Sequence, residues 1–178
     1  MRVAVSGAHF SGKSTLIASL LKKLPHYTSV NEPYYLLEGE GYEFSYPPTL
    51  EDFEAQLKCS IRVIKESQDN TFFDRCPLDC LAYAMAIVEI FSPDDVIDVE
   101  EWVQMMEDAI QKLDLIIFVP IEKRVPVPES EDLELRRNVD EKLHEMLLND
   151  SLGILEDIEV VEAFGSLDNR ASMVLQKL

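Results

Sequence analysis

The stretch that decides the fold is VSGAHFSGKST, which runs from Val5 to Thr15. Within it, the segment GAHFSGKS fits the pattern G-x-x-x-x-G-K-[ST], and Lys13 directly follows the second glycine, Gly12. Because the two glycines carry no side chains, the backbone can curl so that successive N–H groups face one concavity. A helix that begins there adds the positive end of its dipole. The stretch therefore predicts a local site for phosphate groups.

The sequence on either side of this loop supplies the context that such a site requires. Residues 2–6 form a short apolar run that ends before a glycine, as a buried strand does. Apolar residues then recur at helical spacing until Pro25 ends the helix: Leu16, Ile17, Leu20, Leu21 and Leu24. In this arrangement we expect Lys13 to reach the β- and γ-phosphates and the Ser14 hydroxyl to bind Mg²⁺.

The whole loop is expected to contact the phosphates of a bound ATP. The predicted binding residues are Gly7, Ala8, His9, Phe10, Ser11, Gly12, Lys13, Ser14 and Thr15. Of these, His9 and Phe10 are expected to shape the loop without taking part in chemistry. The alternative is a chance glycine-rich turn, which the flanking strand and helix disfavour.

The composition limits the classes of function. The chain has 178 residues, a formal net charge of −18 and a sequence pI of about 4.4. This acidity argues against nucleic acid as a partner, although a few local donors can still hold phosphate. The apolar stretches are too short to span a bilayer, and no signal peptide is visible, so no membrane partner is expected. Three cysteines favour reduced thiols in a cytoplasmic protein, and a homodimer is left open.

Strand-like apolar runs alternate with helical segments along the chain. Further strands are expected at 27–33, 70–75, 114–120 and 158–165. Helices are expected at 13–24, 50–67, 77–91, 99–112 and 131–149 and after Ser166, whereas 34–49 is expected to be a loop. The pattern predicts a single α/β domain over 1–178, with three layers: a five-stranded parallel sheet with helices on both faces.

Charged side chains follow the expected strands at the sheet edge where such folds bind ligands. Asp74 ends the third strand and could hold Mg²⁺ directly or through water, while Arg75 offers a forked donor for phosphate. The alternative for this pair is a simple ion pair at a strand end. Glu32 ends the second strand and could take the proton from an acceptor hydroxyl or orient that hydroxyl. The alternative for Glu32 is a solvated carboxylate.

A proline-rich, charged segment at about 121–137 is expected to form a lid. It carries Arg124, Arg136 and Arg137, which could neutralise charge on a transferring phosphoryl group while the lid excludes water. The alternative is a solvated surface loop.

The loop after the second strand is rich in aromatic residues: Tyr34, Tyr35, Tyr42, Phe44 and Tyr46. These rings could stack on a base or another planar acceptor, or they could pack beneath a long loop, and the sequence favours neither reading. Asp79 could face the acceptor. Cys76 and Cys80 have no third ligand nearby in the sequence, so they do not predict a metal site.

These motifs resemble the P-loop kinases of the nucleoside and nucleotide type. The resemblance rests on GAHFSGKST, on the pair Glu32-Pro33 and on DRCPLDCLAY. Thymidylate kinase-like proteins carry D-R-x-x-x-S-x-x-A-Y, in which Asp79 here replaces the serine. Deoxynucleoside kinases carry an acidic-Arg-Ser motif, in which Cys76 here replaces the serine. The chain is also similar to AAA-type ATPases with a kinase-like core, which include nicotinamide riboside kinase-like domains.

The resemblance implies a P-loop NTPase fold and a place for the adenine. In this group the region after the last strand borders the adenine, which makes Gly165 and Ser166 candidates for contact with the base. Motifs and resemblance together predict an ATP- and Mg²⁺-dependent phosphotransferase acting on a small nucleoside, nucleotide or related riboside. The expected catalytic set is Lys13, Glu32, Asp74, Arg75 and the lid arginines. The alternatives are an ATPase and a nucleotide-binding module without catalysis.

Overall fold

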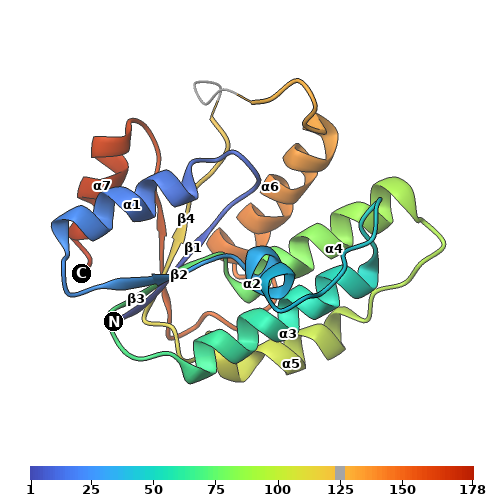
Figure 1. Cartoon of the computed structure of the whole chain (residues 1–178), viewed down its shortest axis with the longest axis horizontal. Helices are drawn as coiled ribbons and strands as arrows, with labels where there is room; N and C mark the ends of the chain where they lie inside the picture. The colour runs from blue at the N-terminus through green and yellow to red at the C-terminus, as the bar shows by residue number, and fades with distance from the viewer. Residues whose placement is uncertain (123–126) are drawn as a thin grey trace.

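The computed structural model describes residues 1–122 and 127–178 (Figure 1). The elements follow one another as β1 (Arg2–Ser6), α1 (Lys13–Lys23), β2 (Thr28–Val30), α2 (Pro33–Gly39), α3 (Leu50–Glu66), β3 (Thr71–Asp74), α4 (Pro77–Phe91), α5 (Val99–Ile110), β4 (Leu115–Phe118), α6 (Leu133–Leu148), β5 (Glu159–Glu162) and α7 (Leu167–Leu175). The strands lie in the order β2-β3-β1-β4-β5, and each neighbouring pair is parallel. The predicted five-stranded parallel sheet is confirmed.

Helices cover both faces of the sheet, as predicted. Figure 1 shows α1 and α7 on one side of the sheet and α3, α4, α5 and α6 on the other. Successive side chains of a strand point to opposite faces, so Val3 and Val5 join the core beneath α1 and α7, whereas Ala4 joins the other core. Phe72 and Phe73 of β3 divide between the two cores in the same way. Two hydrophobic cores, one on each face, therefore fix the three layers.

Capping residues explain where several helices begin. The Thr49 hydroxyl accepts a hydrogen bond from the Asp52 amide, and the Asp52 carboxylate accepts one from the Thr49 amide, so the two residues form a capping box at the start of α3. Asp132 and Ser166 cap α6 and α7 with their side chains. Pro77 is the first residue of α4, where its missing N–H is not needed.

The prediction that 34–49 is a loop is wrong for its first part. Pro33–Gly39 forms the short helix α2, which packs on α3. Pro33 occupies its first turn after the extended Glu32, and Gly41 adopts a positive φ of 90° shortly after its end. A helix of seven residues is too short to be stable alone, so the contact with α3 outweighs the local turn signals that favoured a loop.

Cys59, Cys76 and Cys80 are all buried and form no disulfide with one another. Among the described residues, no three His, Cys, Asp or Glu side chains gather in a way that could hold a metal ion. None of the helices in the described part of the chain combines the length and apolar character needed to cross a bilayer.

Candidate active site

The loop between β1 and α1 curls tightly at the end of β1. Gly7 and Gly12 adopt positive φ angles of 151° and 100°. A β-carbon at Gly7 would collide with the carbonyl oxygen of Val119, directly after β4, so only glycine lets the loop approach that strand this closely. The sequence pattern at 7–14 thus corresponds to a real constraint on the backbone.

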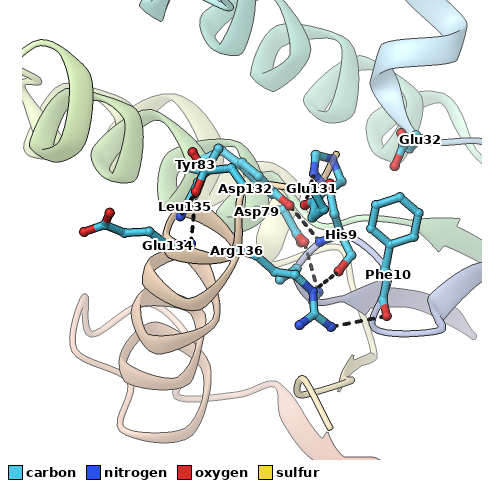
Figure 2. A network of polar contacts seen from close by, with 12 residues as sticks. His9, Phe10, Glu32, Asp79, Tyr83, Glu131, Asp132, Glu134, Leu135 and Arg136 are labelled. Carbon is cyan, nitrogen blue, oxygen red and sulfur yellow. Dashed lines mark hydrogen bonds and ion pairs between the residues drawn. The ribbon is translucent and has the colours of Figure 1, made fainter. Parts of the chain in front are cut away.

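Two arginines that are distant in the sequence hold the carbonyl groups of this loop. Arg136 Nε donates to the carbonyl oxygen of His9 at 2.8 Å, and Arg136 Nη2 donates to that of Phe10 at 3.3 Å (Figure 2). Arg170 Nη1 donates to the carbonyl oxygen of Ser11 at 2.7 Å. Both arginines are buried. Three consecutive carbonyl oxygens are therefore occupied by guanidinium groups, which hold the curl of the loop in place.

Free amides and a buried ammonium make the loop an anion site. Within the described part of the chain, the N–H groups of Gly12, Lys13 and Ser14 donate to no acceptor. The Lys13 ammonium is buried and donates to the carbonyl oxygen of Ala8 at 3.0 Å. Burial and then the charge of Arg75 lower the pKa of Lys13 to about 8. Burial and the neighbouring charge destabilise the protonated form of Lys13, so an anion that enters the loop would stabilise the ammonium.

Two oxygen ligands suited to Mg²⁺ meet at the start of α1. The Ser14 hydroxyl donates to Asp74 Oδ2 at 2.6 Å. Asp74 lies beside β1, paired in register with Val5, and its other oxygen, Oδ1, is buried without a hydrogen-bond partner among the described residues. Burial raises the pKa of Asp74, because the ionised carboxylate is poorly solvated there. An orphaned carboxylate oxygen beside a hydroxyl fits a magnesium ion, which takes oxygen ligands.

Arg75 connects the end of β3 with the end of β2. Its Nε donates to Glu32 Oε2 at 2.7 Å, and its guanidinium lies 4.9 Å from the centre of the Tyr83 ring. Arg75 has a φ of 92°, a conformation that is strained for a residue with a side chain. The structure therefore brings the predicted residues Glu32 and Arg75 together in a partly buried ion pair, and the backbone at Arg75 is strained.

The Asp79 carboxylate joins the end of β1, the phosphate-binding loop and the start of α4. Its Oδ2 accepts from the Ser6 hydroxyl at 2.7 Å and from the Cys76 amide at 2.8 Å, and its Oδ1 accepts from the Gly7 amide at 3.0 Å. Arg75 Nη1 lies 3.4 Å from the same Oδ1. Both oxygens of this fully buried carboxylate are thus engaged by donors of the protein. Asp79 anchors β1, the loop and α4, and it also borders the cavity, so its predicted place beside an acceptor stays a prediction.

A cavity of about 720 Å³ opens between the phosphate-binding loop and α2. Residues Gly12–Thr15 line one part of it, together with Glu32, Asp74 and Arg75. Aromatic side chains line another part: Tyr34, Tyr35, Phe44, Tyr46, Phe53 and Tyr83. Tyr34 and Phe44 stack on each other with ring centres 4.3 Å apart and also border the cavity, so stacking of these rings on a base or another planar acceptor stays a prediction.

The predicted lid at 121–137 is described only in part. Arg124 lies outside the described residues. α6 begins at Leu133, so the end of the predicted lid is helical. The first turns of α6 bring the guanidinium of Arg136 to the carbonyl oxygens of the loop, and neutralisation of a transferring phosphoryl group by Arg136 stays a prediction. Arg137 is exposed, and its Nε lies 3.9 Å from Glu141 Oε1.

The segment after β5 lies on another side of the loop. The Gly165 amide donates to Glu122 Oε1 at 2.5 Å, and the Ser166 hydroxyl caps α7. Neither residue lines the cavity described above. Contact of Gly165 and Ser166 with an adenine therefore stays a prediction.

Sequence reasoning missed Arg170 and recognised Tyr83 only through a resemblance. Arg170 pairs with Glu122 at 3.4 Å besides holding Ser11. The Tyr83 hydroxyl accepts a hydrogen bond from the His9 amide at 2.8 Å, and burial raises the pKa of Tyr83 to about 12, so the hydroxyl stays protonated. An arginine within a short amphipathic helix has no local pattern that distinguishes a loop-holding residue from a solvated one.

Solved structures of small-molecule kinases share this fold. Deoxyadenosine kinase from M. mycoides with bound dATP aligns with a TM-score of 0.67 and 17% identity, covering 99% of this chain and 98% of that chain. Thymidylate kinase from Candida albicans gives 0.65 and 15%, covering 99% and 89%. Shikimate kinase from Aquifex aeolicus vf5 gives 0.58 and 15%, covering 99% and 95%.

Sequence comparison gives the family. No curated protein sequence matches the chain. The model of a family described as AAA domain matches residues 2–170, which is nearly the whole chain. Together with the parallel sheet and the phosphate-binding loop, this match makes the chain a member of the AAA-domain family with a P-loop nucleotide kinase-like fold.

Proposed function

We propose that the protein is an ATP- and Mg²⁺-dependent phosphotransferase that acts on a small hydroxyl-bearing acceptor. One observation carries this proposal: a single cavity is lined both by the start of α1 and by the aromatic residues near α2. A phosphate donor bound to the loop and an acceptor between the rings would thus share one cavity. Phosphoryl transfer needs such positioning more than it needs covalent help from the protein.

The loop supplies the groups that would hold the donor. The free amides of Gly12, Lys13 and Ser14 suit the phosphate oxygens of ATP, and Lys13 suits the β- and γ-phosphates. Ser14 and Asp74 would hold Mg²⁺, which neutralises phosphate charge when it is bound.

Glu32 is the group best placed to handle the acceptor proton. Its Oε2 is held by Arg75, whereas its Oε1 makes no hydrogen bond to a described residue. In the transfer, the acceptor oxygen forms a bond to the γ-phosphorus, and the bond from that phosphorus to the β,γ-bridging oxygen breaks. The hydroxyl proton passes to Glu32, and ADP leaves with the bonding electron pair. Arg75 keeps the Glu32 carboxylate oriented toward the cavity.

The alternative is an ATPase without a small acceptor. An ATPase uses water as its acceptor, and water needs no cavity lined by aromatic rings, so the cavity of about 720 Å³ favours an organic acceptor.

The three buried free thiols suit a reducing compartment such as the cytoplasm.

The test measures ADP release from Mg-ATP with and without a panel of nucleosides, nucleotides and ribosides. We expect ADP release to depend on an acceptor, and Glu32→Gln to lower acceptor phosphorylation about 100-fold while ATP still binds. Glu38→Gln, an exposed change in the short helix that follows Glu32, is the matched control. Acceptor-independent ADP release at an equal rate would establish the ATPase instead.

A further inference from the structure

Carboxylates outnumber cations around the cavity. The acidic side chains among its described lining are Glu32, Asp74, Asp79 and Glu131, and the cationic ones are Lys13 and Arg75. His9 also borders the cavity. Its imidazole is 47% exposed, and its Nδ1 lies 3.6 Å from Glu131 Oε1, so the ring is already paired with a carboxylate of the lining.

Both cations are already engaged. Lys13 lies within the phosphate-binding loop, where it donates to the carbonyl oxygen of Ala8 and faces the position of a donor phosphate. Arg75 is paired with Glu32 at 2.7 Å and lies 3.4 Å from Asp79. The described lining of the cavity therefore contains no uncommitted cation for a second anionic group.

An acceptor that carries its own phosphate or carboxylate would find no free cation in the described lining of the cavity. Such a group needs a positioned arginine or lysine when it leaves water, because burying an unpaired anion is unfavourable. Glu131 adds to this effect, since it borders the cavity with a side chain only 16% exposed. The described part of the lining thus selects against negative charge on the acceptor.

The aromatic side chains favour a ring without negative charge. Phe53 and Tyr83 stack nearly parallel, with centres 5.7 Å apart and an angle of 8°, and Tyr34 and Phe44 form the second stacked pair at 22°. The faces of such rings attract neutral planar groups and cations and repel anions.

We propose that the phosphoryl acceptor is a ring compound with a free hydroxyl and no negative charge, that is, a nucleoside or riboside and not its monophosphate or a carboxylic acid. This inference rests on the proposed function. The transferred phosphoryl group then becomes the first phosphate of the product, which is a monophosphate formed together with ADP.

The test compares acceptors of different charge. With saturating Mg-ATP, kcat/KM is measured for neutral nucleosides, for an N-ribosyl pyridinium cation, for the corresponding 5′-monophosphates and for shikimate. We expect at least one uncharged or cationic acceptor to exceed its own 5′-monophosphate by about 100-fold. A monophosphate or shikimate that is the best acceptor overturns this inference and leaves the proposed kinase intact. Transfer to no acceptor, with Mg-ATP bound, overturns the proposed function and the inference with it.

A variant tests the electrostatic reason separately. Glu131→Gln removes one negative charge at the cavity, and we expect it to narrow the preference for nucleoside over monophosphate by about 3-fold at low salt. Glu129→Gln makes the same change two residues away on an exposed side chain outside the cavity lining, and it should leave the ratio unchanged. An equal ratio in both variants and the wild type would contradict selection by charge.

Discussion

Arg170 Nη1 lies 2.7 Å from the carbonyl oxygen of Ser11, although the two residues are 159 positions apart in the chain. The last helix of the protein thus holds the first loop. Arg136, from α6, binds the two preceding carbonyl oxygens of the same loop. The curl of the phosphate-binding loop therefore depends on side chains from the C-terminal half of the molecule as well as on its own glycines.

Arg170→Met should loosen this loop and destabilise the protein. The substitution leaves the Ser11 carbonyl oxygen unpaired and Glu122 without its ion pair, so we expect a loss of about 2 kcal/mol in the free energy of unfolding. Urea denaturation measures the change, and calorimetric titration should show weaker ATP binding. Arg137→Met removes an exposed pair with Glu141 and should change stability by less than about 0.5 kcal/mol. Equal effects of the two variants would show that Arg170 does not hold the loop.

Lys13 should give the ligand-free protein a distinctive pH dependence. Its pKa falls from 10.5 in the unfolded chain to about 8 in the folded protein. Between these values the unfolded chain binds more protons than the folded protein, so the Lys13 contribution makes stability rise with pH. Across the window from pH 8 to 10.5, this contribution raises the free energy of unfolding by an amount on the order of 3 kcal/mol.

The measurement is the difference in unfolding free energy between the wild type and Lys13→Met at several pH values. This difference should favour the wild type progressively as pH rises through the window. Lys23→Met, at an exposed position of the same helix, should give a flat difference. If the difference in unfolding free energy for Lys13→Met were also independent of pH, the lowered pKa of Lys13 would be contradicted.

Magnesium dependence should reside in Ser14 and Asp74. Asp74→Asn weakens the oxygen ligand beside the Ser14 hydroxyl, so we expect activity to fall about 10- to 100-fold and half-saturation to need more Mg²⁺. Chelation by EDTA should abolish transfer in the wild type. Asp69→Asn, at an exposed carboxylate before β3, should keep the wild-type magnesium curve. Unchanged magnesium dependence in Asp74→Asn would remove Asp74 from the site.

The sheet, its strand positions and the main helices could be predicted because their signals are local. The glycine spacing of 7–14, the continuous apolar strands and the caps at Thr49 and Ser166 each specify the conformation of their own segment. The helix α2 could not be predicted, since its stability comes from α3 and not from its own seven residues.

Only part of the polar network of the site could be predicted from the sequence. Glu32, Asp74 and Arg75 stand at strand ends, and the parallel sheet brings such ends together. Arg136 and Arg170 bind backbone carbonyl oxygens, and every residue has one, so no sequence pattern marks the partner. Whether a buried arginine faces a ligand or a loop is decided by the packing of its helix.

The most direct test of a shared donor and acceptor cavity is the binding of a bisubstrate analogue. Adenosine joined through a polyphosphate chain to the 5′ oxygen of an accepted nucleoside would span from the loop to the aromatic rings. Calorimetric titration should give one analogue per chain, bound about 100-fold more tightly than ATP, with displacement of both ATP and the nucleoside. An analogue that binds no more tightly than ATP, and that leaves nucleoside binding undisturbed, would contradict the shared cavity.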